Sequence, residues 1–202
     1  MSTVMEPPID TTAEESPYLF STEEFYRLLE SEFFPSEARV GLWEGRIYEK
    51  MSKTQAHAVA GDKVHRTLDR VLPGGWYVGG ENPITVSANK APLPDLIVLR
   101  GEPDDYIDHR PDPADVGLVV ELSVTSLKID TGPKLAAYAS AGITAYWVIN
   151  LVDRLIHVYA KPVAAEGRFA STATVKLGET VPLTLDGVQV ALIAASDLLP
   201  IR

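Results

Sequence analysis

Two carboxylates stand inside the most apolar stretches of this chain. Asp95 begins the apolar segment 95–99, and Glu121 interrupts the apolar segment 117–124. Burial of an unpaired carboxylate is costly, and two acids that share a site do not both ionise comfortably without a cation. A divalent metal resolves the conflict, and hard oxygen ligands favour Mg²⁺ or Mn²⁺ over Zn²⁺. The pair therefore predicts a metal site, provided that the two segments are neighbouring strands.

A lysine and a tyrosine further along the chain can complete such a site. Lys134 lies one turn into the helix expected after the Glu121 segment, so its ammonium can swing back over the strand end. That charge could hold a phosphate oxygen or an attacking water while a metal polarises the phosphorus. Tyr138, at i+4 on the same helix face, either hydrogen-bonds in the site or covers the sheet.

Spacing predicts the elements that position these residues. Alternation places Glu121 with Val119 and Ser123 on one strand face. The predicted order is that of an α/β or α+β domain with a mixed central β-sheet flanked by helices. We expect a helix capped by Ser21 that ends near Ser31, a long helix over 55–72, and a helix through 134–141 capped by Asp130 or Thr131. We expect strands over 46–51, 76–78, 84–87, 94–100, 117–124, 144–150, 154–159, 172–176, 180–185 and 188–193.

Composition limits the class of protein. With 202 residues, 46% of them hydrophobic, we expect a single domain over residues 18–202, preceded by a disordered acidic tail over 1–17. No cysteine is present, which excludes thiolate zinc sites, disulfides and a cysteine nucleophile. The net charge of −10 repels phosphate, so DNA as a partner requires a local basic patch or a bound metal.

Three expectations concern surroundings and assembly. The first residues carry neither a cationic start nor an apolar stretch, and no apolar run is long enough for a membrane span, so we expect a cytoplasmic protein without a membrane partner. Apolar and aromatic residues in the hairpin 146–159 and in the C-terminal strands predict a homodimer. The candidates for a basic groove are Lys50, Lys53, Lys63, Arg66 and Arg70.

The order of these residues resembles a known family. Pro94-Asp95, Glu121, Asp130 with the segment 134–138, and the segment 142–150 look like the Uma2 family, which is similar in fold to restriction endonucleases of the PD-(D/E)XK superfamily. The resemblance spans roughly residues 20–159. It implies a restriction-endonuclease-like core, Mg²⁺ or Mn²⁺ as cofactor, and DNA as substrate.

The resemblance also implies roles for individual residues. Asp95, Glu121 and the backbone carbonyl of Leu122 would bind the metal. The family lysine, which ordinarily follows the glutamate by two residues, would be replaced by Lys134, because position 123 is a serine. Gly41 stands where the family has an early glutamate, with Glu44 nearby in the family's aspartate position. The accessory candidates are Glu44, His57, Ser123 and Tyr138.

Structural alternatives compete with each of these roles. Asp95 alone could cap a turn, Glu121 and Lys134 could form a buried ion pair without turnover, and His57 could lie at the surface or cap its helix. Two function classes follow: a metal-dependent endonuclease, and a nuclease-fold interaction module that has lost catalysis. The acidic composition and Gly41 favour the second.

Overall fold

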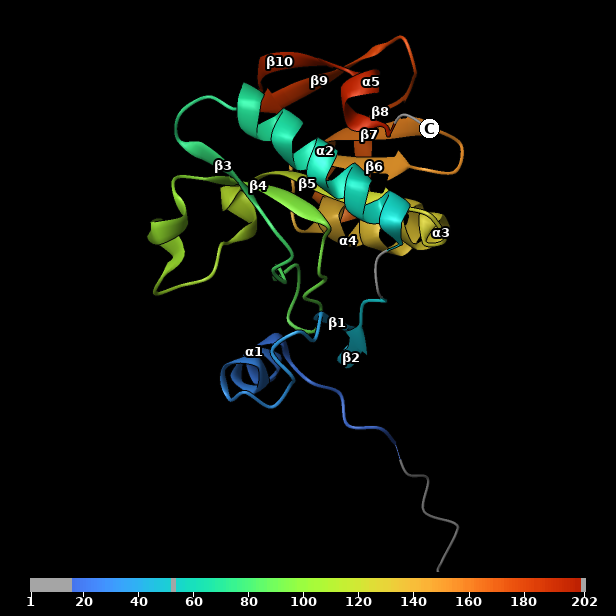
Figure 1. The fold of residues 1–202 in the computed structure, drawn as a ribbon. Coiled ribbons are helices and arrows are strands. Elements are labelled where there is room, and N and C mark those ends of the chain that lie inside the picture. The colour runs from blue at the N-terminus through green and yellow to red at the C-terminus, as the bar shows by residue number, and fades with distance from the viewer. Residues whose placement is uncertain (1–15, 52–53, 201–202) are drawn as a thin grey trace, which may run out of the picture.

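The computed structural model describes residues 16–51 and 54–200, and a mixed sheet lies at its centre (Figure 1). Its strand order is β3-β4-β5-β6-β7-β8; only β5 and β6 pair in parallel. This confirms the expected mixed sheet. The strands are β3 (Trp76–Gly79), β4 (Leu96–Arg100), β5 (Val116–Ser123), β6 (Ala145–Asn150), β7 (Leu155–Val163) and β8 (Arg168–Lys176).

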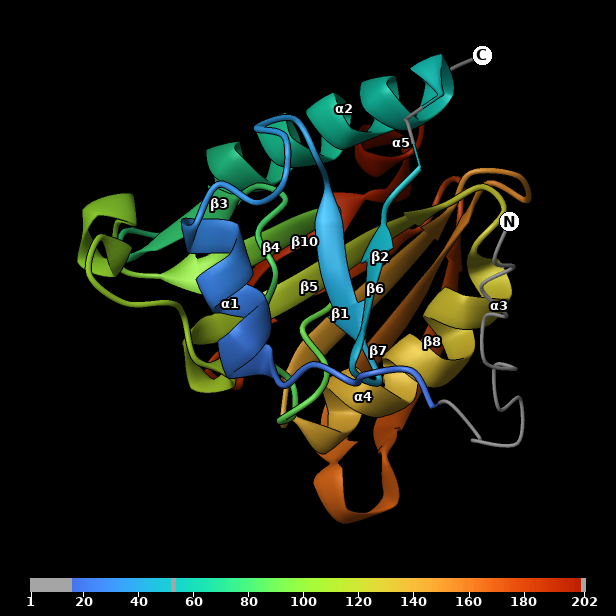
Figure 2. The same cartoon turned by 90° about the horizontal axis from the view of Figure 1, so that it is seen from below.

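One face of the sheet is covered by the long helix α2 (Gln55–Val71), as Figures 1 and 2 show. Its residues Ala60, Val64 and Leu68 recur at helical spacing and are completely buried, which confirms the predicted helix. The hairpin of β9 (Thr180–Leu185) and β10 (Val188–Ala194) and the short helix α5 (Ala195–Leu198) complete this layer. The leucine and valine side chains of β5 that point away from Glu121 belong to the same core.

The other face is covered by the crossover that joins β5 to β6. It consists of α3 (Leu127–Ile129), a π-helical turn over Asp130–Lys134, and α4 (Leu135–Ser140). The predicted cap at Asp130 or Thr131 is wrong, because helical structure already begins at Leu127. Pro133 lies inside the π turn and removes one backbone N–H donor from it.

A smaller subassembly packs beside the sheet. The helix α1 (Thr22–Glu30) carries the predicted capping box with Ser21, and it packs against the hairpin of β1 (Val40–Trp43) and β2 (Arg46–Glu49). Phe25 and Leu42 are fully buried in this contact, and a backbone bridge joins Leu42 to Ala91. Figure 2 shows the hairpin beside the sheet, between α2 and α4.

Other details differ from the sequence-based expectations. Residues 84–87 form no strand but a loop with one isolated bridge, Ser87 to Lys90. Tyr146 and Trp147 are core residues rather than a surface patch. Residues 1–15 of the expected tail lie outside the described residues. Short 3-10 helices cover Pro103–Tyr106, Pro113–Asp115 and Ala164–Glu166. In the described part of the chain, every helix is too short or too polar to cross a membrane.

Candidate active site

The sheet register brings the two predicted carboxylates together. Asp95 directly precedes β4, and Leu96 of β4 faces Val120 of β5, so Asp95 lies beside the end of β5 that carries Glu121. The Leu122 N–H donates to Asp95 Oδ2 (2.8 Å) where the ladder between β4 and β5 ends. Both carboxylate side chains are only 2% exposed. The apolar strands thus carry two buried acids at one edge of the sheet.

A lysine from the β1–β2 hairpin holds the two acids together. Lys50 Nζ lies 2.8 Å from Asp95 Oδ1 and 3.5 Å from Glu121 Oε2, and it donates to the Leu93 carbonyl (3.1 Å). Lys50 follows β2 directly, and its N–H is bonded to the Arg39 carbonyl. The hairpin therefore supplies to the two acids a cation, Lys50, that was expected only in a candidate basic groove.

The second lysine, Lys134, reaches Glu121 from the helical crossover that joins β5 to β6. Lys134 Nζ lies 2.9 Å from Glu121 Oε1 and 3.1 Å from Asp130 Oδ1. Tyr138, one helical turn later, donates its hydroxyl to the same Glu121 oxygen (3.0 Å). Both residues therefore reach Glu121 as expected, and Lys134 is buried rather than solvated.

Asp130 is anchored in turn by its own set of donors. The hydroxyls of Ser123 and Ser126 each donate to Asp130 Oδ2 at 2.5 Å, and Tyr146 donates to the Asp130 backbone carbonyl (2.9 Å). The π turn places Asp130 and Lys134 on the same inner side. Ser123 thus contacts the site indirectly, through Asp130.

His57 lies in the first turn of α2 and also reaches Asp95. Its Nε2 is 3.3 Å from Asp95 Oδ1, while its Nδ1 is buried without a hydrogen-bond partner among the described residues. His57 therefore lies in the cluster, as expected of an accessory site residue, rather than at the surface.

Electrostatics differ between the two acids. Burial alone would raise the pKa of Asp95, but the hydrogen bond with His57 and the positive charge of Lys50 outweigh burial and hold this pKa well below its usual range. Burial raises the pKa of Glu121 despite the charges of Lys134 and Lys50. Burial acts to lower the pKa of Lys134, but Glu121 and Asp130 more than compensate and raise it. Lys134 is therefore a permanent cation.

The donor chemistry fits a hard divalent cation. Asp95 Oδ1 and Glu121 Oε2 both contact the same ammonium group, that of Lys50. Within residues 16–51 and 54–200, no group of three or more His, Asp or Glu side chains is arranged as a metal cage. Mg²⁺ commonly binds through one or two carboxylates together with water and substrate phosphate. A site of two carboxylates therefore suits Mg²⁺ or Mn²⁺.

The predicted accessory Glu44 is not brought to the cluster. It lies in the β1–β2 turn, at the opposite end of the hairpin from Lys50, and pairs with Lys90 at 3.5 Å. Gly41 lies opposite Tyr48 in the hairpin, and a Cβ at Gly41 would lie only 2.6 Å from the Tyr48 hydroxyl. The Tyr48 ring thus fills the space over Gly41.

We expect Gly41→Ala to lower the free energy of unfolding by about 1–3 kcal/mol, because overpacking forces a fixed ring to move. Tyr48 cannot yield easily, since its hydroxyl accepts a hydrogen bond from the Leu93 N–H (3.1 Å). Urea unfolding measures the effect, with Gly80→Ala as control because a Cβ there meets nothing within 4 Å. Equal stability of the two variants would contradict this packing.

The lowered pKa of Asp95 predicts a pH-dependent contribution to stability. An unfolded aspartate titrates at about 3.9, so a lower folded pKa stabilises the protein fully above that pH, and the contribution is lost as pH falls below it. Urea unfolding of metal-free wild type and Asp95→Asn should show a stability gap at pH 6 that narrows towards pH 3. A gap that stays constant would contradict the assignment.

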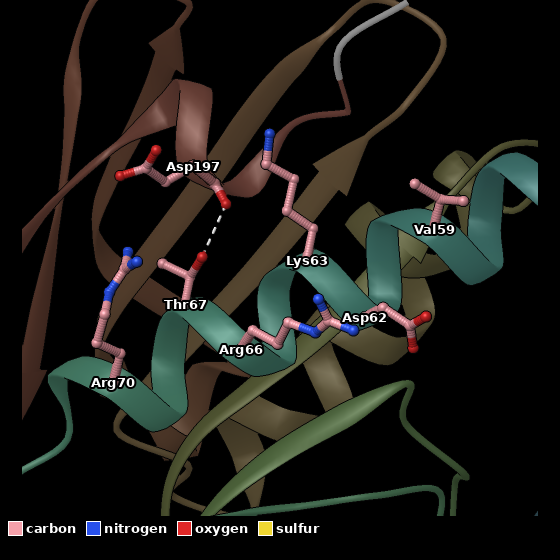
Figure 3. Close-up of a pocket in the computed structure, with 7 residues that line it drawn as sticks. All are labelled: Val59, Asp62, Lys63, Arg66, Thr67, Arg70 and Asp197. Carbon is pink, nitrogen blue, oxygen red and sulfur yellow. Dashed lines mark hydrogen bonds between the residues drawn. The ribbon is translucent and has the colours of Figure 1, made fainter.

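The remaining basic candidates lie elsewhere on α2. Lys63, Arg66 and Arg70 line a pocket of about 430 Å³ between α2 and α5, together with the acidic Asp62 and Asp197 (Figure 3). Lys63 Nζ donates to the Leu199 carbonyl (2.8 Å). This pocket is of mixed charge and none of its lining residues belongs to the carboxylate cluster. Lys53 lies outside the described residues.

A family model described as "Uma2: Putative restriction endonuclease" matches residues 22–194. The curated proteins contain no match. A solved structure, "a putative nuclease belonging to DUF820 from Anabaena variabilis ATCC 29413", aligns with a TM-score of 0.63 at 15% identity, covering 89% of this chain and 97% of that one. The match confirms the expected nuclease-like fold.

Proposed function

The chain belongs to the Uma2 family, and on that premise we propose that it is a divalent-metal-dependent endonuclease that hydrolyses phosphodiester bonds of DNA. One observation carries the proposal. Asp95 Oδ1 and Glu121 Oε2 both contact Lys50, while Lys134 contacts the other oxygen of Glu121, so two buried carboxylates and a fixed positive charge meet at one edge of the sheet. Mg²⁺ or Mn²⁺ is the proposed cofactor.

Each residue has a defined task in this proposal. Asp95, Glu121 and the Leu122 carbonyl would hold the metal, which when bound acidifies a water and polarises the phosphate. Leu122 N–H and Tyr138 fix the carboxylate oxygens that face away from Lys50. Lys134 offsets the negative charge that grows on the phosphate in the transition state. His57 orients Asp95 through Oδ1.

A cleavage assay with the wild-type protein tests the proposed reaction. Supercoiled plasmid and single-stranded DNA are incubated with Mg²⁺, with Mn²⁺ and with EDTA. We expect nicked or shortened products only with metal, each carrying a 5′ or 3′ phosphate from hydrolysis. Intact DNA under all metal conditions, from a folded protein, would contradict the proposal.

Metal binding is expected to stabilise the fold independently of turnover. The folded protein holds the two carboxylates together and should therefore bind a divalent cation more tightly than the unfolded chain does. Mn²⁺ should accordingly raise the melting temperature of the wild type. The rise should disappear in Glu121→Gln and persist in Glu179→Gln, which alters an exposed acid. An unchanged rise in Glu121→Gln would place the metal elsewhere.

A lapsed nuclease that serves as an interaction module is the second candidate. It is favoured by the ion pairs themselves, because Lys50 and Lys134 already neutralise Glu121 without any metal. Such a module would show neither Mn²⁺ stabilisation nor cleavage while the cluster still contributed to folding stability.

We also propose that residues 18–202 act as one domain and that the protein is a cytoplasmic homodimer. The homodimer is supported by exposed apolar residues of β10: Val188 and Leu192 are 63% and 61% exposed. Light scattering at micromolar concentration should give twice the chain mass of 22.0 kDa, and a monomer would contradict the dimer.

A further inference from the structure

The four carboxylate oxygens of Asp95 and Glu121 are divided between two kinds of partner. Asp95 Oδ2 accepts from the Leu122 backbone, and Glu121 Oε1 accepts from Tyr138 and contacts Lys134. These partners belong to the sheet and to the helical crossover. The remaining two oxygens, Asp95 Oδ1 and Glu121 Oε2, both contact Lys50, and His57 Nε2 also lies 3.3 Å from Asp95 Oδ1. Lys50 therefore occupies the position that joins the two acids.

The surroundings of the Lys50 ammonium resemble those of a bound metal. Two carboxylate oxygens and the Leu93 carbonyl surround it at 2.8, 3.5 and 3.1 Å. This is the oxygen donor chemistry that Mg²⁺ and Mn²⁺ prefer. A metal ion that bridges the same two carboxylates would have to use the same oxygens. The metal ion and the Lys50 ammonium would then lie within a few Å of each other and repel strongly.

Lys50 can leave this position more easily than Lys134. Its side chain is 17% exposed, and it extends by a flexible four-carbon stem from the residue that directly follows β2. Lys134 is 11% exposed and is held between Glu121 and Asp130, which is itself fixed by two serine hydroxyls. A competing cation would therefore displace Lys50 rather than Lys134.

We propose that Lys50 is a built-in competitor of the divalent metal: its ammonium joins Asp95 and Glu121 in the metal-free protein and must be displaced before the metal binds. The inference rests on the proposed function and adds to it a residue that sets metal affinity. Lys50 keeps the two carboxylates together without metal and raises the metal concentration that is needed to occupy the site.

Metal affinity, measured without any substrate, tests the competition. Free Mn²⁺ is followed by electron paramagnetic resonance as it is titrated into wild type, Lys50→Gln, Lys50→Arg and Lys176→Gln. Lys50→Gln should bind Mn²⁺ about 10- to 100-fold more tightly than wild type, because the repelling charge is gone. Lys50→Arg keeps the charge and should bind no more tightly than wild type. Lys176→Gln, an exposed lysine at the end of β8, should leave affinity unchanged.

Each other outcome has a definite meaning. Equal or weaker binding by Lys50→Gln, with wild type binding normally, would overturn the competition and leave the metal site standing. Tighter binding by Lys50→Arg would also overturn it. Because Lys50→Arg keeps the positive charge beside Asp95 and Glu121, this test can still be made if Lys50→Gln fails to fold. Binding by Lys50→Gln alone would support the inference. Absence of binding to every folded variant at millimolar Mn²⁺ would overturn both the inference and the metal-dependent function.

Discussion

Lys134→Ala is expected to slow metal-dependent DNA cleavage by about 10²–10³-fold, because it removes a preorganised charge from a buried site. The same change should lower the free energy of unfolding by about 3–5 kcal/mol, since the carboxylates of Glu121 and Asp130 lose the ammonium between them. Initial rates of plasmid nicking and urea unfolding curves measure the two effects on the same preparation.

Controls separate catalysis from stability at Lys134. Lys128→Ala removes an exposed lysine from the same helical crossover and should change neither quantity. In a lapsed nuclease Lys134→Ala would lower stability alone, since there is no cleavage to lose. A folded Lys134→Ala variant with unchanged metal-dependent cleavage would contradict both functions and move the catalytic role to another residue.

Asp95→Asn should abolish cleavage and metal binding together. The amide keeps an oxygen for the Leu122 N–H but removes the charge that Lys50 and His57 contact, so the metal loses one of its two carboxylates. We expect cleavage to fall by at least about 10²–10³-fold at saturating Mg²⁺ and the Mn²⁺-induced rise in melting temperature to vanish.

A matched substitution controls for the loss of an acidic side chain. Asp186→Asn breaks an exposed pair with Arg100 (2.6 Å) and should leave cleavage unchanged. Cleavage by Asp95→Asn at the wild-type rate would exclude Asp95 as a metal ligand, even if the variant were less stable.

The two acids could be found from sequence because burial made them anomalous. A carboxylate within a continuous apolar strand needs a partner, and β4 and β5 were correctly expected to be strands. Alternation in the sequence could not show that these strands pair with each other. The register of β4 and β5 in the structure brings Asp95 beside Glu121. Lys134 and Tyr138 followed from helical spacing.

Other parts of the site carried weaker signals. Asp130 stands four residues before Lys134, a spacing that allows a helical ion pair, but its polar neighbours favoured a cap. Hydrogen bonds from Ser123 of β5 and Tyr146 of β6 hold Asp130 of the π turn against the sheet, and local sequence does not show these contacts. Nothing in the sequence around Lys50 indicates a role in the site, because Lys50 contacts Asp95 from 45 residues away in the chain. Only folding brings Lys50 to the acids.

The central claim is that Asp95 and Glu121 hold the metal that drives DNA cleavage. It is tested most directly by comparing the initial rate of plasmid nicking of wild type and Glu121→Gln, at saturating Mg²⁺ and in EDTA. The amide preserves the shape of the side chain and removes the charge that both lysines contact. We predict nicking by wild type only with Mg²⁺ and a loss of at least about 10²–10³-fold in Glu121→Gln. Nicking by folded Glu121→Gln at the wild-type rate, or nicking that persists in EDTA, would contradict the claim.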